Sequence, residues 1–510
     1  MKKINKYLIF SFVVALITLL ITSKNSFLYV FNDWVDANAF FTVGKSLFNK
    51  VIPYKDIFEQ KGPLLYLIYG FGYLISNKSF HGVFIIEVIS FTVFLYYLHK
   101  IFSMFFNKKY SLVLLPYISM LITISGSFVH GGSCEEFCFP FITISLYYYF
   151  KHFNKEELTK KEIIINGLMA GCVFMMKYTM LGFWIGFCTF ICINYLIKKE
   201  YKKIITFCLL FLLGMMIPFA IWLIYFLING GVREFIDVYF KLNMTSYTND
   251  EKYGIIRKII EIIKYVYKEL KYKKMFLRIL IILPFLALIT KEKGKIFRLS
   301  LVGLIYITIF FIYWGLKVFV YYNLPIYLIT LVITVLFIMQ ILKKYIDRVI
   351  NNKYIIIFLI MFLSGVLLQT YRYANYKEYI KKKKEDFFQY KYAEYISNYE
   401  NPTLLNMGFL DVGVYTTSEI IPNTRFFEVQ NFDYEKFKDN LDEMKKYVEN
   451  KEIKFIVYAK FGNNAEPPEY IYNNYKQVYK DNYISEGNES TAYLFELKDL
   501  KKSNNNVKVK

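Results

Sequence analysis

The chain has 510 residues, of which 56% are hydrophobic and 20% aromatic, and it carries a formal net charge of +22. Soluble domains do not combine these values, so they exclude a single soluble domain and indicate a polytopic membrane protein. The basic excess does not indicate nucleic-acid binding, because Lys and Arg interrupt the apolar runs instead of clustering on one polar domain.

Apolar runs long enough to cross a bilayer recur along the chain. A spanning helix needs about 20 apolar residues, and roughly eleven segments meet that requirement, which predicts an all-α polytopic membrane protein. The first follows basic residues and has no small-residue cleavage site after it, so we expect an uncleaved span. The expected spans are centred on residues 7–23, 82–102, 111–128, 136–153, 163–177, 180–197, 204–228, 276–290, 298–315, 322–342 and 354–370.

The distribution of Lys and Arg between short loops predicts the orientation in a plasma membrane. One set of loops is basic, and the opposite set, around 129–135, 178 and 316–321, is poor in basic residues. The amino terminus is therefore expected in the cytoplasm, and the first loop and the carboxyl tail outside. Residues 229–275 would also face outward although they are basic, but long loops carry little weight in this rule.

The composition changes after residue 370. Residues 371–500 are polar and contain strand-like runs, which predicts a small α/β domain outside the membrane, beside a transmembrane domain of residues 1–370. The last ten residues, 501–510, have the composition of a disordered tail. The expected strands are Thr403–Met407, Arg425–Val429, Phe455–Tyr458 and Ala492–Glu496, and the expected helix is Tyr434–Asn450.

The first loop, residues 24–80, has the length and amphipathicity of one or two helices lying along the bilayer surface. Its charged residues alternate with aromatic ones. Asp36 precedes Ala37–Phe41, so it is expected at the start of an apolar helical face, where partial burial favours a general base. Lys61 stands where the chain re-enters the bilayer, at the level of lipid phosphates. Solvated interfacial charge is the alternative interpretation for each carboxylate. The loop's other carboxylates are Asp33, Asp56 and Glu59.

The second outward loop contains the run His130-Gly-Gly-Ser-Cys-Glu-Glu, which places two carboxylates, Glu135 and Glu136, in a short turn above two spans. Cys134 and Cys138 flank these carboxylates at a spacing that suits one helical face. A disulfide or a metal site there is a possible but not a favoured interpretation. The other cysteines are expected to be small core residues: Cys172, Cys188, Cys192 and Cys208.

The ordered combination of an early Asp, a Pro-Tyr-x-Asp and a Lys-x-Pro-Leu-Leu-Tyr resembles the GT-C class of glycosyltransferases. The resemblance is strongest to the bacterial branch related to protein O-mannosyltransferases and lipid A aminoarabinose transferases. It covers the first 150 residues well and is topological beyond them. The matching residues are Asp36, Pro53, Tyr54, Asp56, Lys61, Pro63, Leu64, Leu65 and Tyr66.

The resemblance implies a role for each matching position. Asp36 takes the place of the first-loop catalytic aspartate, Glu135 or Glu136 that of the second-loop acid, and Lys61 that of the lysine near the donor phosphate. The family often has Asp-Glu where this chain has Asp36-Ala37, which leaves open whether Asp33 supplies a second carboxylate.

Later positions follow the same comparison. Lys317, Tyr321 and Tyr322 resemble a basic-aromatic loop of the family, and Tyr54 is a further candidate for the lipid or sugar. Lys177 could contact phosphate, although a snorkelling interfacial lysine is the favoured interpretation. No nucleotide is implied. Some members bind a divalent cation, Mg²⁺ or Mn²⁺, through their acids and others bind none, so a metal at Glu135 and Glu136 stays open.

The implied reaction moves a sugar from a polyprenyl-phosphate donor to a hydroxyl of a polysaccharide, lipid or protein acceptor on the outer face, with inversion. Two other classes remain. A lipid-linked sugar flippase or transporter would place charges within its spans and show paired halves, but Glu87 is the main acidic residue in an apolar run. An O-antigen-type polymerase or ligase would use arginines in a late loop, where this chain has Arg233 and Arg257.

Overall fold

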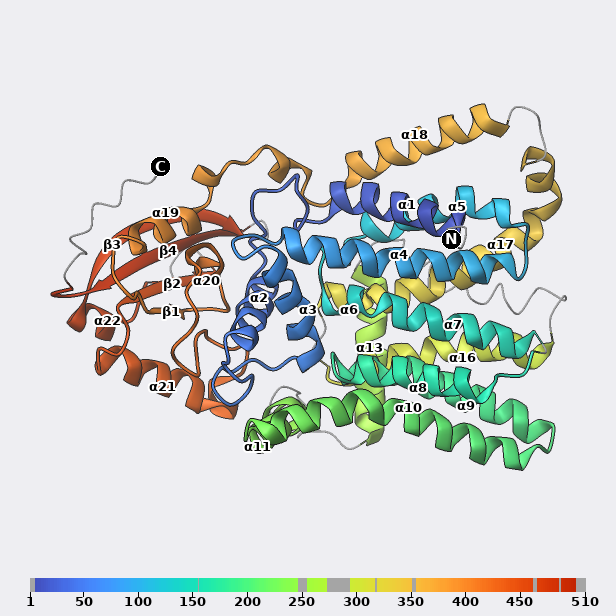
Figure 1. Cartoon of the computed structure of the whole chain (residues 1–510), viewed down its shortest axis with the longest axis horizontal. Helices are drawn as coiled ribbons and strands as arrows, with labels where there is room; N and C mark the ends of the chain where they lie inside the picture. The colour runs from blue at the N-terminus through green and yellow to red at the C-terminus, as the bar shows by residue number, and fades with distance from the viewer. Residues whose placement is uncertain are drawn as a thin grey trace. The chain divides into compact units, whose positions relative to one another are not determined.

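A computed structural model of the chain describes residues 5–154, 156–245, 255–272, 294–316, 319–350, 355–461, 466–485 and 488–500. Within them the chain forms two compact units (Figure 1). One comprises residues 1–23, 86–225 and 248–377, and is called the helical unit below. The other comprises residues 24–85, 226–247 and 378–510, and is called the mixed unit. The expected span 276–290 and the expected tail 501–510 lie outside the described residues.

The helical unit is built from long apolar helices. Five helical stretches of the described chain are long and apolar enough to cross a membrane: His81–Ser103, Tyr178–Ile197, Tyr201–Ile228, Lys295–Ile312 and Val320–Lys343. Multi-pass membrane character is therefore confirmed, whereas the number of crossings stays a prediction. The helices are α1 (Lys6–Thr22), α4 (His81–Ser103), α5 (Ser111–Thr123), α6 (Cys134–Phe137), α7 (Phe139–Phe153), α8 (Lys160–Phe174), α9 (Gly182–Ile197), α10 (Tyr201–Ile228), α13 (Ile255–Tyr272), α16 (Lys295–Ile312), α17 (Leu324–Ile350) and α18 (Ile355–Tyr373).

Helices occupy every expected span for which residues are described. The expected spans 163–177 and 180–197 are separated by a break in the helix, because α8 ends at Phe174 and a short 3-10 turn, Tyr178–Leu181, leads into α9. A capping box defines the start of α8: Thr159 accepts from the Glu162 amide, and the Glu162 side chain accepts from the Thr159 amide. These reciprocal bonds satisfy amides that a helix start leaves unpaired.

The mixed unit joins three stretches that are far apart in the sequence. The first loop supplies α2 (Val35–Phe48) and α3 (Pro63–Ile75), and the middle stretch supplies α11 (Val232–Phe235), the π-helical turn Ile236–Leu242 and α12 (Asn243–Thr245). The carboxyl-terminal stretch supplies α19 (Phe388–Ile396), β1 (Leu404–Met407), α20 (Val414–Ser418), α21 (Lys438–Glu449), β2 (Phe455–Phe461), α22 (Glu469–Asn474), β3 (Tyr475–Ser485) and β4 (Asn488–Leu497).

A four-stranded sheet forms the centre of the carboxyl-terminal stretch, in the order β1-β2-β4-β3 (Figure 1). β1 pairs with β2 in parallel, and β4 pairs antiparallel with both β2 and β3. The expected small α/β architecture is present. Strands lie near three of the four expected positions, and α21 lies within the expected helix Tyr434–Asn450. The division into residues 1–370 and 371–500 stays a prediction.

The expected strand Arg425–Val429 is wrong, and β3 was not expected. The 425–429 backbone bonds several partners instead of one neighbouring strand: Arg425 O accepts from the Phe58 amide at 2.8 Å, and Phe427 O accepts from the Asn406 amide at 3.0 Å. β3 has few aliphatic residues, so its sequence lacks a strong strand signal, and its pairing along β4 supplies the missing stabilisation.

Two glycines allow α2 and α3 to cross closely. A Cβ placed on Gly44 would lie 2.6 Å from the Gly70 amide nitrogen and 2.7 Å from Tyr66 O, which are both backbone atoms. Backbone cannot move aside as a flexible side chain can, so this crossing requires glycine. The crossing fixes the position of α2 against α3 within the mixed unit.

The buried polar residues of α2 are satisfied by the carboxyl-terminal stretch. Thr42 donates to Asp411 Oδ2 at 2.7 Å, and the fully buried Lys45 donates to Tyr415 O and Ile420 O at 2.9 and 2.6 Å. Burial raises the pKa of Asp411 to about 6 and lowers the pKa of Lys45 to about 8. Each group is thus held where its charged form is disfavoured, although hydrogen bonds offset part of that cost.

Replacing Gly44 by Val tests the helix crossing. The added side chain must push α3 away, so we expect a melting temperature several degrees lower and a smaller monodisperse fraction in detergent, as overpacking costs of about 1–3 kcal/mol produce. Gly365→Val on α18 is the matched control, because a Cβ there meets no atom within 4 Å. Equal melting temperatures of the two variants would contradict the crossing.

Asp411→Asn tests the burial of that carboxyl. The folded-state pKa of Asp411 is raised from 3.8 to about 6, so its stabilising effect is complete below pH 3.8 and lost as pH rises through 6. The shift corresponds to about 3 kcal/mol. We expect melting curves of the wild type to lose stability relative to the variant across this window. A pH-independent difference between the two proteins would refute the assignment.

Candidate functional site

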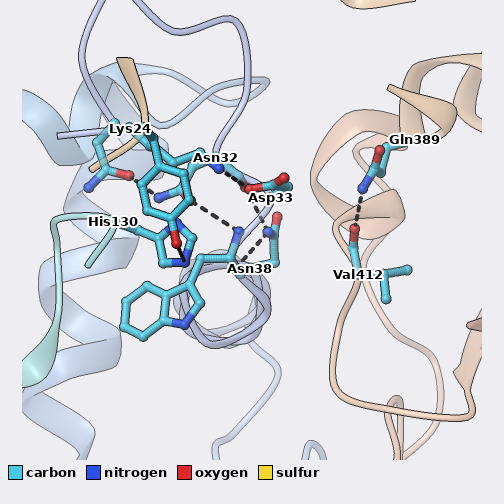
Figure 2. Close-up of polar contacts among 10 residues, drawn as sticks. Lys24, Asn32, Asp33, Asn38, His130, Gln389 and Val412 are labelled. Atoms are coloured by element: carbon cyan, nitrogen blue, oxygen red, sulfur yellow. Dashed lines mark hydrogen bonds and ion pairs between the residues drawn. The ribbon is translucent and has the colours of Figure 1, made fainter. Parts of the chain in front are cut away.

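Asp36 lies in the first turn of α2, as predicted, and is half-buried. The helix begins after Trp34, which is extended and makes no side-chain cap bond. Asn38 anchors the turn, because its side-chain amide donates to the backbone oxygens of Asn32 and Trp34, each at 2.9 Å (Figure 2). A helix amino terminus is a favourable place for a negative charge. The fold thus presents one carboxylate of the first loop at a rigid helix start.

Asp33 has a different environment. It forms an ion pair with Lys24, whose side chain is fully buried, and its own side chain is 17% exposed (Figure 2). The Lys24 ammonium also lies 3.9 Å from the ring centre of Tyr379, and burial together with Asp33 raises the pKa of the Tyr379 hydroxyl. Sequence reasoning missed Lys24 and Tyr379, since no local pattern links residues 24, 33 and 379. Asp33 is therefore a paired carboxylate.

The segment from Tyr54 to Lys61 is a tight turn that holds Lys61. Tyr54 has a positive φ of 69°, and its buried hydroxyl donates to Lys61 O at 2.6 Å. Asp56, which is exposed, accepts from the Ile52 amide at 2.9 Å. Glu59 is buried and accepts from the Lys61 amide and from the Tyr66 hydroxyl. Tyr54, Asp56 and Glu59 thus shape the turn, and the Lys61 ammonium lies 5.6 Å from the Phe40 ring centre.

The middle stretch of the mixed unit packs on this turn. The Tyr54 ring lies 5.5 Å from that of Phe226 and 5.8 Å from that of Phe235. The Asn243 amide donates to Gln60 O at 2.8 Å, and Lys55 donates to Asn229 O at 2.9 Å. Residues 226–247 and the first loop therefore form one packed body.

The second loop brings its two carboxylates to different partners. Gly131 and Gly132 have φ of 84° and 74°, and Ser133 caps the short helix α6. Glu135 pairs with the ammonium of Lys177 at 2.5 Å. Glu136 accepts from the Gly132 amide at 2.8 Å, and its carboxyl lies against that of Glu87. Adjacent acids of one helical turn thus serve separate contacts.

Lys177 is not a snorkelling lysine, which corrects the favoured interpretation. Its side chain is only 13% exposed, and its ammonium lies 3.0 Å from the ring centre of Tyr322 and 6.0 Å from that of Tyr321. Pairing with Glu135 and with an aromatic ring holds it inside the helical unit. The predicted grouping of Tyr321 and Tyr322 with Lys317 stays a prediction, because Lys317 lies outside the described residues.

The described residues do not fit the open prediction of a metal at Glu135 and Glu136. A cation held by both residues would have to displace Lys177 from Glu135. No group of three His, Cys, Asp or Glu side chains suited to a metal occurs in the described part of the chain. Cys134 and Cys138 are buried free thiols. His130 stacks on Tyr376 with ring centres 4.4 Å apart.

A cavity of about 490 Å³ lies within the mixed unit beside Asp33. Its wall combines charged, amide and aromatic side chains, among them Lys382, Gln389, Asp481 and Tyr483. The Gln389 amide nitrogen donates to Val412 O at 2.9 Å (Figure 2), while its buried oxygen has no hydrogen-bond partner among the described residues. The cavity can thus offer hydrogen bonds to a polar molecule.

Comparison with known proteins identifies related folds. Residues 60–225 match the family model of dolichyl-phosphate-mannose-protein mannosyltransferase. The crystal structure of ArnT from Cupriavidus metallidurans bound to undecaprenyl phosphate is similar with a TM-score of 0.56 at 8% identity. The same protein in the apo state gives 0.54 at 9% identity. Each similarity covers 96% of this chain and 97% of that chain.

Among curated proteins the sequence has no match. At such low identity the structural similarity shows the fold. The resemblance predicted from the first loop is confirmed in these terms: the chain has the GT-C fold of ArnT, and residues 60–225 match the mannosyltransferase family.

Proposed function

We propose that this protein is a membrane glycosyltransferase that moves a sugar from a polyprenyl-phosphate donor to a hydroxyl of a cell-envelope acceptor on the outer face. The observation that carries the proposal is the ordered first loop, with Asp36 at a helix start and Lys61 held by the Tyr54 turn, in a chain with the fold of ArnT. The undecaprenyl phosphate in that ArnT structure supports a lipid-phosphate donor here.

The chemistry requires a base and a stabilised leaving group. Asp36 accepts the proton of the acceptor hydroxyl as its oxygen attacks the anomeric carbon. The bond from that carbon to the phosphate oxygen breaks, and polyprenyl phosphate leaves with its electrons. Attack from the face opposite the phosphate inverts the anomeric centre. Lys61 stabilises the phosphate charge electrostatically. Lys317, outside the described residues, is a further candidate from the sequence.

The proposal also assigns roles to three residues of the helical unit. Glu135 is the second-loop acid, because its carboxylate pairs with the Lys177 ammonium, whereas Glu136 faces another carboxyl. Tyr321 and Tyr322 flank the same ammonium and offer aromatic surface to the lipid-linked sugar. No step of the proposed reaction uses a metal ion.

The cavity beside Asp33 supports a role for the carboxyl-terminal stretch in acceptor binding. Its carboxylates, lysines and amides can bond sugar hydroxyls, and its aromatic rings can pack on sugar faces. Asp33 itself is held by Lys24, so it serves as part of this wall rather than as the base.

Packing within the mixed unit supports the predicted orientation. Residues 24–85, 226–247 and 378–510 form one compact body and so lie on the same side of the membrane. Residues 226–247, the first part of the basic segment, then lie on the same side as the first loop. The first loop and the carboxyl-terminal stretch then both face outward, and the amino terminus is cytoplasmic.

The rival classes have weaker support. A polymerase or ligase would use arginines of the late loop, but the Arg233 side chain is 89% exposed and pairs only loosely with Asp237, at 3.6 Å. Charge within the spans would favour a flippase or transporter. Glu87 on α4 is such a group, but it accepts a hydrogen bond from Ser23 and lies against Glu136. That carboxyl has local partners, which favours a positioning role.

Asp36→Asn tests the proposed base. We expect transfer of label from radiolabelled polyprenyl-phosphate sugars, supplied as a panel to membranes containing the full chain, to fall by about 10²–10⁴-fold. Glu394→Gln, at an exposed position of α19, is the control that keeps activity. Full activity of the Asp36 variant would rule out Asp36 as the general base. Label that crosses the bilayer without being transferred to an acceptor would favour the flippase.

Lys177→Met tests the pairing of the second-loop acid. Removing one partner of a buried pair costs about 3–5 kcal/mol, since the remaining charge is left uncompensated. We expect a clear loss of thermal stability in the single variant. The double variant with Glu135→Gln should regain most of it, because no lone charge remains. If the two changes were simply additive, Lys177 and Glu135 would not be coupled.

A further inference from the structure

Glu87 and Glu136 are two acids buried against each other in the helical unit. Both side chains are almost fully buried, and each has one oxygen that accepts from a neutral donor: Ser23 for Glu87, at 2.8 Å, and the Gly132 amide for Glu136, at 2.8 Å. The Glu136 carboxyl also lies against the Glu87 carboxyl, and its second oxygen accepts from no donor in the described part of the chain. The pair therefore joins the end of α1, the span α4 and the second loop.

A hydrogen bond between two carboxyls requires a proton. An ionised carboxylate only accepts, so two carboxylates in contact would repel, and burial would increase that cost. The neighbouring charged groups offer no substitute. Lys177 is held by Glu135 and Tyr322, and His130 stacks on Tyr376. Burial and the Glu87 carboxyl raise the pKa of Glu136 well above its usual value, against the opposing effect of the Gly132 amide.

The loop backbone is shaped around this pair. Gly131 has a φ of 84°, and a Cβ placed there would lie 2.8 Å from Glu87 Oε1 and closer still to Ser23. Only a residue without a side chain lets the turn approach so closely. This close approach of Gly131 to Glu87 fixes the turn that begins α6. Glu135 directly precedes Glu136 in that short helix.

We infer that Glu87 and Glu136 share one proton and together act as a positioning pair for the second loop, setting the orientation of Glu135. The inference rests on the proposed function for the role of Glu135, but the shared proton itself does not depend on it. The pair carries one negative charge in total, and the proton belongs to both acids. Of the two adjacent acids, only Glu135 then remains a full carboxylate toward its surroundings.

Infrared spectroscopy of the full chain in lipid nanodiscs, without substrate, tests the shared proton. We expect a carbonyl band of a protonated carboxylic acid at neutral pH that shifts in D₂O and is lost in both Glu87→Gln and Glu136→Gln. Absence of the band from the wild type would overturn the inference. Because no substrate is present, this result is independent of whether glycosyl transfer is ever observed.

Paired substitutions at residue 87 test the positioning role. In Glu87→Gln the amide donates to Glu136 in place of the proton, so we expect melting temperature and transfer rate close to those of the wild type. Glu87→Leu removes the bond, and we expect a melting temperature lower by several degrees and a transfer rate reduced at least tenfold. Equal behaviour of the two variants would overturn the positioning role.

A bound cation would be the competing explanation of the contact. Elemental analysis of the wild type should show no divalent metal that is retained after dialysis and lost in Glu136→Gln. Retention of about one Mn²⁺ or Mg²⁺ per chain, lost in that variant, would overturn the shared proton. If the protonated-acid band is present but no sugar is transferred from any donor, the shared proton is supported and only the proposed function is contradicted.

Discussion

The burial of α2 by the carboxyl-terminal stretch is the constraint on which the mixed unit depends. Water cannot solvate Lys45, so its ammonium uses the carbonyl oxygens of Tyr415 and Ile420. Thr42 and Asp411 form a second link between the same segments. An unpaired buried ammonium or carboxyl would cost several kcal/mol, so these bonds allow only one placement of the helix. The first turn of α2, which carries Asp36, is positioned as a result.

The same rule explains how the structure treats its other buried charges. Glu135 is paired with a lysine, Glu136 with another acid, and Asp33 with the buried Lys24. Each contact gives a partner to a charged or polar group that is buried away from water. The chemical consequence differs, however, because a carboxylate held by an ammonium stays ionised, whereas one held by a second carboxyl requires a proton.

The sequence predicts best what depends on local pattern. Hydropathy located the spans, and the change from charged to apolar residues after Asp36 located the start of α2. Errors came where long-range contacts decide. The 425–429 segment reads as a strand, but its carbonyls bond Phe58 and Asn406. Lys177 reads as an interfacial lysine, and only the fold brings Glu135 and Tyr322 to it. For the pair formed by Glu87 and Glu136, the sequence contains one indication, which is that Glu87 is an acidic residue within an apolar run.

The contact between Thr42 and Asp411 has a consequence for biogenesis. The two residues are 369 positions apart in the chain, so α2 is synthesised long before its partner. Until the carboxyl-terminal stretch is present, Lys45 and Thr42 lack these partners and must stay hydrated. The final packing of α2 is therefore a late event in folding, and a ribosome that stalls before residue 411 leaves α2 without the partners of Thr42 and Lys45.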